Sequence, residues 1–124
     1  MNIRLRFLIV DDNAGFLQAA RDLLQRQGAD VVGMASNGAE AVRLARELQP
    51  DCVLVDIELG PESGFELATR LTIDDHQRVV LISVHSETEV IDLVSTTPAL
   101  GFLPKADLSL QRIADLLNDA RPTE

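Results

Sequence analysis

Five short apolar runs recur along the chain, and each is followed by a segment with apolar residues at helical spacing. The runs are residues 5–10, 30–35, 52–55, 79–83 and 101–103. Runs of this length with few polar interruptions are typical of strands that are covered on both faces of a sheet. The pattern therefore predicts five buried β-strands.

Helix start and stop signals stand between these runs. Asn37 and Ser86 are each followed three residues later by a glutamate, which is the spacing of a capping box. Gly28 and Pro50 are typical of residues that follow a helix end. Helices are expected at about 13–27, 37–48, 63–71, 86–95 and 110–117, with a loop at 56–62.

The strict alternation of strands with helices predicts an α/β fold, because parallel strands need a crossover connection and a helix usually provides it. Five such units in 124 residues fit a doubly wound parallel sheet, the flavodoxin-like (βα)5 arrangement with strand order 2-1-3-4-5. That order predicts a ligand crevice beside the first and third strands, outside their carboxyl ends.

Length and composition predict one domain and narrow the choice of partners. Apolar residues make up 46% of the 124 residues, so residues 1–124 are expected to form one domain with a polar tail from about Asn118. No apolar run approaches the roughly 18 residues of a membrane span and no signal peptide is recognisable, so we expect a cytoplasmic protein without membrane association. The net charge of −9 argues against direct nucleic-acid binding by this chain.

Cysteine and histidine are too sparse for a zinc site. Cys52 is the single cysteine and lies inside an apolar run, so we expect it to be buried and without a disulfide. His76 and His85 lack a second histidine or cysteine at metal-ligand spacing. The basic residues are ten arginines and one lysine, Lys105, which marks Lys105 as a candidate for a specific role.

Polar side chains stand at the ends of four of the five predicted strands. The first strand leads to Asp11 and Asp12, the third to Asp56, the fourth ends at Ser83, and the fifth leads to Lys105. Because the carboxyl ends of parallel strands meet at one edge of a sheet, we expect these five side chains to lie together.

The three aspartates of this edge predict a metal site. Carboxylates within about 4 to 6 Å of one another repel by several kcal/mol unless a cation compensates. Oxygen ligands without histidine or cysteine favour a hard divalent ion. A set that leaves room for water and phosphate oxygens favours Mg²⁺, or Mn²⁺ in its place.

The same edge carries the groups that phosphoryl transfer requires. A carboxylate can attack phosphorus and form an acyl phosphate, and Asp56 lies centrally, directly after an apolar strand. Lys105 would bring a compact positive charge to one phosphoryl oxygen, and Ser83 a hydrogen bond to another. We therefore interpret Asp56 as the nucleophile.

These motifs, taken in order, resemble the receiver domain of bacterial two-component response regulators. They are LIVDD at 8–12, VLVD at 53–56 with Gly64 eight residues on, VLIS at 80–83 and GFLPK at 101–105. The resemblance covers almost the whole chain. It implies a phosphoacceptor switch in which Asp56 takes a phosphoryl group from a sensor histidine kinase or a phosphotransfer protein. It also implies a regulatory domain that catalyses only its own phosphorylation and dephosphorylation.

The resemblance implies a ligand set for the metal and a switching mechanism. The implied ligands are Asp12 and Asp56 directly, Asp11 largely through water, and the backbone carbonyl of Glu58. Phosphoryl oxygens are contacted by the hydroxyl and the lysine at the strand ends. Family members switch by moving that hydroxyl towards the phosphoryl group while an aromatic residue turns inward, and Phe102 occupies the aromatic position.

Further expectations concern partners and the lifetime of the phosphoryl group. The fourth helix, fifth strand and fifth helix form the family's output face, which is the expected partner or homodimer surface. Glu58, Val84 and His85 occupy positions that tune the phosphoryl lifetime in the family.

This sequence departs from the family pattern at three places. Val84 stands where a small residue is usual and would narrow access to Asp56. Ala106 follows the lysine where proline is common, and Gly60 stands where the loop after the phosphoacceptor often has proline.

Two other functions stay open at this point. A receiver-like binding module that works without phosphorylation is favoured slightly by Val84 and by the absence of a proline after Lys105. A small phosphatase of the haloacid dehalogenase type would also use an aspartate and Mg²⁺, but its Asp-x-Asp signature is absent because Ile57 and Glu58 follow Asp56. The C-terminal segment GFLPKADLSLQRIADLL resembles receivers joined to helix-turn-helix output domains, so the chain is either a stand-alone regulator or part of a longer one.

Overall fold

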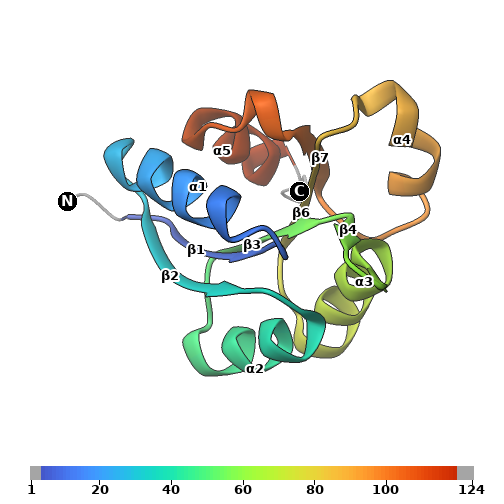
Figure 1. The fold of residues 1–124 in the computed structure, drawn as a ribbon, viewed down its shortest axis with the longest axis horizontal. Helices are drawn as coiled ribbons and strands as arrows, with labels where there is room; N and C mark the ends of the chain where they lie inside the picture. The colour runs from blue at the N-terminus through green and yellow to red at the C-terminus, as the bar shows by residue number, and fades with distance from the viewer. Residues whose placement is uncertain (1–3, 120–124) are drawn as a thin grey trace.

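The computed structural model describes residues 4–119, which form a five-stranded parallel sheet between two layers of helices (Figure 1). The strands of this sheet are β1 (Arg6–Val10), β2 (Asp30–Ala35), β3 (Cys52–Asp56), β6 (Val79–Ser83) and β7 (Gly101–Pro104). Their order is β2-β1-β3-β6-β7. This is the predicted order 2-1-3-4-5, and the α/β, flavodoxin-like fold is confirmed.

Helices cover both faces of the sheet. They are α1 (Ala14–Arg26), α2 (Gly38–Leu48), α3 (Gly64–Asp75), α4 (Glu87–Val94), α5 (Leu110–Asp119) and the short 3-10 helix η1 (Lys105–Asp107). Figure 1 shows α1 and α5 on one face, and α2 and α3 on the other with α4 beside the β7 edge. The core therefore has two parts, one that includes Leu54 under α1 and α5, and one that includes Leu81 under α2, α3 and α4.

The helices begin and end at the residues that carry the local signals. The Asn37 side chain accepts the backbone N–H of Glu40 at 2.9 Å, and Ser86 forms a capping box with Glu89. Gly28 follows α1 with φ +104°, a conformation that glycine adopts without the steric penalty of a Cβ. These local signals thus mark where α2 and α4 begin and where α1 ends.

Two helices are longer than predicted. α3 continues past Leu71, its last buried residue, to Asp75, because its backbone hydrogen bonds persist after the apolar face ends. α5 runs through Asn118 to Asp119, so the first two residues of the predicted polar tail are helical. The rest of that tail, 120–124, lies outside the described residues.

The segment predicted as a loop after β3 contains a small hairpin instead. Its strands are β4 (Glu58–Leu59) and β5 (Glu62–Ser63), which pair antiparallel around a turn at Gly60. Two-residue strands are too short to show an alternating pattern, so periodicity could not predict them. The hairpin connects the end of β3 to the start of α3.

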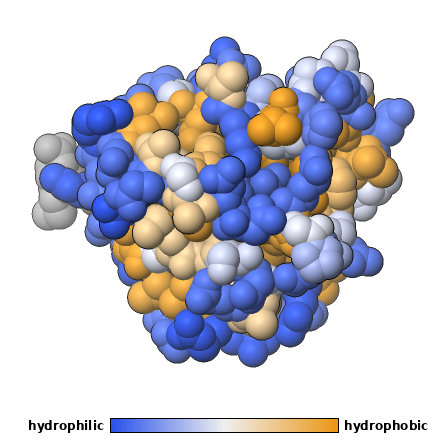
Figure 2. Space-filling model, viewed as in Figure 1, coloured by the Kyte–Doolittle hydropathy of each residue, from blue (hydrophilic) through white to orange (hydrophobic). Residues whose placement is uncertain are grey.

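The surface is mixed. On the face shown in Figure 2, hydrophilic residues surround smaller apolar patches. Large apolar side chains that are exposed include Ile73, Val84, Ile91 and Leu93.

Cys52 is buried as expected, and burial raises the pKa of its thiol to about 12. None of the helices in the described part of the chain is long and apolar enough to cross a membrane.

Candidate functional site

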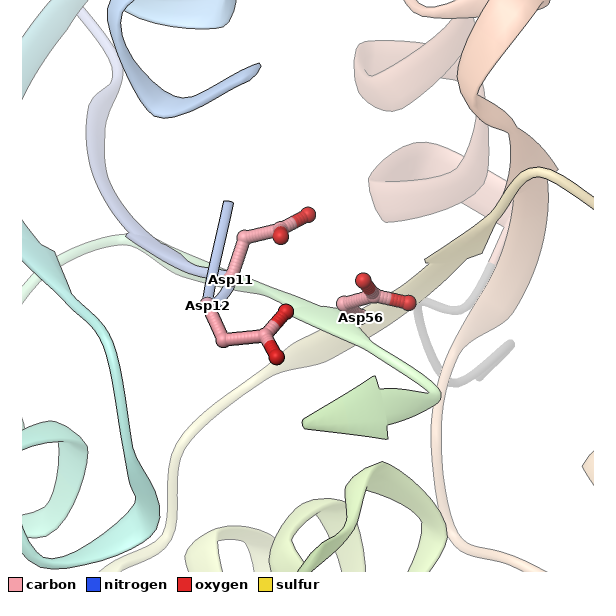
Figure 3. Close-up of side chains that lie close together, drawn as sticks. All are labelled: Asp11, Asp12 and Asp56. Atoms are coloured by element: carbon pink, nitrogen blue, oxygen red, sulfur yellow. The ribbon is translucent and has the colours of Figure 1, made fainter. Parts of the chain in front are cut away.

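Three aspartates from two neighbouring strands meet at the carboxyl edge of the sheet. Asp11 and Asp12 directly follow β1, and Asp56 is the last residue of β3, which pairs with β1. One carboxylate oxygen from each lies within 4.8 Å of the other two. Figure 3 shows the three side chains close together at the strand ends. We call this set the aspartate cluster.

Lys105 extends from the end of β7 to the aspartate cluster. It begins η1, directly after β7. Its Nζ lies 2.7 Å from Oδ2 of Asp11 and donates a hydrogen bond of 3.2 Å to Oδ2 of Asp56. Three strand ends therefore deliver the acids and the cation to one point, as the sequence predicted.

Backbone amides orient two of the aspartates. The N–H of Asn13 donates to Oδ1 of Asp11 at 2.8 Å, and the N–H of Glu58 donates to Oδ1 of Asp56 at 3.1 Å. Asp11 is fully buried and Asp56 is only 6% exposed, whereas Asp12 is exposed. The two buried carboxylates are held in place, and the third lies at the opening.

Burial and neighbouring charges shift two pKa values in this site. Burial, together with the negative charge of Asp11, raises the pKa of Asp56 to about 6, against the opposing effects of the Glu58 amide and of Lys105. Burial lowers the pKa of Lys105, but the hydrogen bonds and negative charges of Asp11 and Asp56 raise it by more, so the pKa of the lysine is raised overall. The lysine is charged at neutral pH.

A hard divalent cation fits the aspartate cluster. Oδ2 of Asp11 is buried and lies 2.7 Å from Nζ of Lys105, with which it forms an ion pair. Three neighbouring carboxylates, two of them buried, carry more negative charge than one ammonium neutralises, and they form an oxygen donor set of the kind that Mg²⁺ prefers. A pocket of about 290 Å³ opens onto these oxygens and leaves room for other ligands.

The lining of this pocket includes most of the predicted site residues. It consists of Asp11, Asp12, Asn13, Asp56, Glu58, Gly60, Val84 and Lys105. Val84 lines the pocket and is 76% exposed. The three aspartates, Glu58, Val84 and Lys105 are thus brought together.

Ser83 and Phe102 lie outside the pocket lining. Ser83 is fully buried at the end of β6, and its Oγ accepts the backbone N–H of His85 at 3.0 Å. Phe102 is buried in β7, where it packs in the core cluster under α2, α3 and α4. The structure therefore does not bring these two predicted site residues into the pocket.

His85 links the hairpin to α4 beside the site. Its Nε2 lies 2.8 Å from Oε1 of Glu58, and its Nδ1 lies 3.2 Å from Oε2 of Glu89. Hydrogen bonds first to Glu58 and then to Glu89 raise the pKa of His85. The backbone amide of Ser86 is the main cause that lowers the pKa of Glu89.

Two glycines allow the backbone to approach the site closely. A Cβ on Gly64 would lie 1.9 Å from the carbonyl oxygen of Asp56, so only glycine fits there. Gly60, with φ +61°, brings the hairpin turn towards Asp12, whose Oδ2 lies 3.3 Å from the position of a Cβ. The hairpin can therefore lie against both acid-bearing strand ends.

Sequence reasoning missed several residues of the site. Asn13 and Gly60 line the pocket, Glu89 bonds His85, and the ring of Phe16 lies under the Lys105 ammonium at 4.2 Å. Asn13 follows the acid pair directly and could have been found as a helix cap. No local signal connects Phe16 with Lys105, since the contact exists only in the folded chain.

Comparisons with known proteins agree with this geometry. Residues 7–118 match the family model described as the response regulator receiver domain. A response regulator receiver protein from Anaeromyxobacter sp. (strain Fw109-5) is 37% identical over 90% of this chain and 46% of its own length. The chemotaxis protein CheY from Thermotoga maritima is 30% identical over 91% of this chain and 94% of its own length.

Solved structures give the same result. A two-component response regulator of the LuxR family from Aurantimonas sp. SI85-9A1 superposes with a TM-score of 0.84 at 28% identity, covering 98% of this chain and 90% of that one. The chain spans about half the length of several curated relatives, 46% to 50%.

Proposed function

This chain belongs to the response regulator receiver domain family of two-component systems, and on that basis we propose that it is a phosphoacceptor switch with Asp56 as the acceptor. One observation supports this most. A buried carboxylate at the end of the central strand lies in hydrogen-bond contact with the chain's one lysine and within reach of two further acids. We propose that residues 1–124 act as one receiver domain.

The proposed reaction moves a phosphoryl group from nitrogen to oxygen. An Asp56 oxygen attacks the phosphorus of a phosphohistidine, the new O–P bond forms, and the N–P bond breaks so that the imidazole leaves with its electron pair. Asp56 must be ionised to attack. A pKa of about 6 keeps the carboxylate mostly charged at neutral pH and more basic than an ordinary aspartate.

The aspartate cluster is proposed to hold Mg²⁺, or Mn²⁺, through Asp11, Asp12, Asp56 and the backbone carbonyl of Glu58. When bound, the ion neutralises negative charge on the carboxylates and on phosphoryl oxygens. The chemistry of the donor set supports this proposal, because three carboxylates, two of them buried, carry more negative charge than the single Lys105 ammonium neutralises.

Lys105 and Ser83 are proposed to bind the phosphoryl oxygens. Lys105 already lies at Asp56, and phosphorylation would remove the charge of that carboxylate and free the ammonium for a phosphoryl oxygen. Ser83 would have to give up its bond with the His85 amide to do the same. We propose that this exchange, coupled to the inward state of Phe102, alters the face formed by α4, β7 and α5.

Partners follow from this scheme. The phosphoryl donor is a sensor histidine kinase or a phosphotransfer protein, and the α4–β7–α5 face is the proposed output and homodimer surface, without direct nucleic-acid binding by this chain. Glu58, Val84 and His85 are proposed to set the lifetime of the acyl phosphate, because Glu58 and Val84 line the pocket at Asp56 and His85 bonds Glu58. Such a chain is a regulator that catalyses only its own phosphorylation and dephosphorylation.

A phosphorylation-independent interaction module is the second candidate. The observation that favours it is Val84, which projects an apolar side chain at the rim of the pocket. This candidate keeps the fold and the acidic edge but predicts no covalent modification.

Incubation with acetyl phosphate and Mg²⁺ separates the two candidates. The phosphoacceptor proposal predicts that intact-mass measurement shows one added phosphoryl group, which is lost without Mg²⁺ and in Asp56→Asn. Absence of the added mass over the whole range of Mg²⁺ and donor concentration favours the interaction module.

A further inference from the structure

We propose that Phe16 is a positioning residue for Lys105, and that its ring directs the ammonium to the phosphoryl group. This inference rests on the proposed function of the site. Lys105 Nζ lies 4.2 Å from the centroid of the Phe16 ring, within the range of a cation–π contact. It is the one such contact that the described residues contain.

The ammonium of Lys105 contacts Asp11, Asp56 and the Phe16 ring. Only the ring is chemically unchanged by phosphorylation and metal binding. Oxygens of Asp11 and Asp56 lie 2.7 and 3.2 Å from Nζ, and the centroid of the Phe16 ring lies 4.2 Å from it. Phosphorylation turns Asp56 into an acyl phosphate, and a metal ion competes for the oxygen of Asp11. The ring carries no charge to neutralise and binds no metal, so its attraction for the ammonium persists.

The position of the ring is fixed by the same residues that orient the acids. The Asn13 side chain accepts the backbone N–H of Phe16 at 3.0 Å, while the Asn13 backbone N–H donates to Asp11 at 2.8 Å. Asp11, Asn13 and Phe16 are therefore linked by hydrogen bonds across the junction between β1 and α1. Phe16 also packs against the core cluster under α1 and α5, which limits the movement of its ring.

These contacts give Phe16 a defined role. A lysine side chain with four rotatable bonds has many conformations in solvent, and a site gains most from it when the charge is held near its target beforehand. The ring holds the ammonium at the pocket after Asp56 loses its charge and the metal ion competes for Asp11. The proposed effect is on recognition of the phosphoryl group, with little effect on metal binding.

The test compares Phe16→Leu with Phe16→Tyr and with the unmodified chain. Leucine keeps an apolar side chain but removes the aromatic face, whereas tyrosine retains the face. Phe65→Leu is a matched control, because Phe65 is another partly buried ring and packs against the opposite core cluster. Two affinities are measured for each protein: that of Mg²⁺ alone, and that of beryllofluoride, a tetrahedral phosphoryl analogue, in saturating Mg²⁺.

The expected result is specific to the phosphoryl analogue. Phe16→Leu weakens beryllofluoride binding about threefold to tenfold and leaves Mg²⁺ binding within about twofold, while Phe16→Tyr and Phe65→Leu behave like the unmodified chain. Equal losses for Mg²⁺ and beryllofluoride would mean that the ring only supports the shape of the site, and this would overturn the inference. So would an unchanged affinity in Phe16→Leu, or a loss that tyrosine does not restore. Failure of the unmodified chain to bind the analogue would instead contradict the proposed function.

Discussion

Asp56 is subject to opposing influences on its charge. Burial and Asp11 favour the neutral acid, while the Glu58 amide and Lys105 favour the carboxylate, and the result is a pKa near 6. A carboxylate in this state is stabilised when a cation binds beside it. The proposed metal and phosphoryl chemistry therefore uses an unfavourable charge arrangement that the fold imposes at the end of β3.

The raised pKa of Asp56 predicts a pH dependence of stability in metal-free buffer. The folded state prefers the protonated acid, so this contribution to the free energy of unfolding is complete below about pH 4 and is lost as the pH rises through about 6. Asp56→Asn lacks this loss. Its stability relative to the unmodified chain should increase by about 2 kcal/mol between pH 4 and 7, as measured by urea unfolding.

The contribution of His85 is common to both proteins and cancels in their difference. Mg²⁺ at neutral pH should stabilise the unmodified chain more than Asp56→Asn. A pH-independent difference between the two proteins would show that Asp56 is not perturbed in the folded state.

The bridge through His85 gives a second prediction for a single residue. Hydrogen bonds to Glu58 and Glu89 raise the pKa of His85, with Glu58 as the larger cause. NMR titration of the imidazole should therefore give a pKa above its ordinary value in the unmodified chain. Glu58→Gln should lower that pKa more than Glu89→Gln does. The reverse order would show that the ring bonds mainly to α4.

At the scale of elements, the strand ends could be predicted and the connections between them only in part. Buried parallel strands appear in the sequence as apolar runs, and the polar residue that ends each run marks the functional edge, which is why Asp11, Asp12, Asp56 and Lys105 were found. The β4–β5 hairpin was missed because two paired residues leave no periodic pattern. Contacts such as that of Phe16 with Lys105 depend on how α1 packs beside η1, and no local pattern encodes that.

The junction of β3, the hairpin and α3 depends on Gly64. A Cβ there would overlap the carbonyl of Asp56, at 1.9 Å, so Gly64→Ala must displace the backbone that carries the acceptor. We expect a loss of about 3 kcal/mol in the free energy of unfolding, together with slower modification by acetyl phosphate.

Gly28→Ala is the matched control for that substitution. Gly28 has φ +104° and no atom within 4 Å of a Cβ, so only the backbone penalty of about 1 kcal/mol applies, far from the site. Chemical denaturation and intact-mass kinetics measure both effects. If the two variants lose the same free energy of unfolding and are modified at the same rate, the backbone around Gly64 can accommodate a Cβ without a further loss of stability.

At the scale of the whole molecule, one sheet joins two core clusters and carries the site on its edge. Leu54 and Leu81 are both fully buried on the neighbouring strands β3 and β6, and their side chains pack in opposite core clusters. Because every site residue lies on a strand of this sheet or in a connection from it, loosening either layer should affect the same edge. The sheet thus makes the two layers one structural unit.

This organisation predicts cooperative unfolding. Leu54→Ala and Leu81→Ala should each lower the free energy of unfolding by about 2–5 kcal/mol, because each leaves a cavity in one cluster. Calorimetry should still give one transition in both variants, with equal calorimetric and van't Hoff enthalpies. Two separate transitions in either variant would show that the helix layers are independent.

The central claim is that the aspartate cluster exists to put a phosphoryl group on Asp56, and chemical trapping tests it most directly. After incubation with acetyl phosphate and Mg²⁺, sodium borohydride reduces an acyl phosphate to an alcohol, so phosphorylated aspartate is recovered as homoserine. Peptide mass mapping is predicted to find homoserine at position 56 alone. Homoserine at position 11 or 12, or none at any position while a known receiver domain is trapped in parallel, would contradict the account.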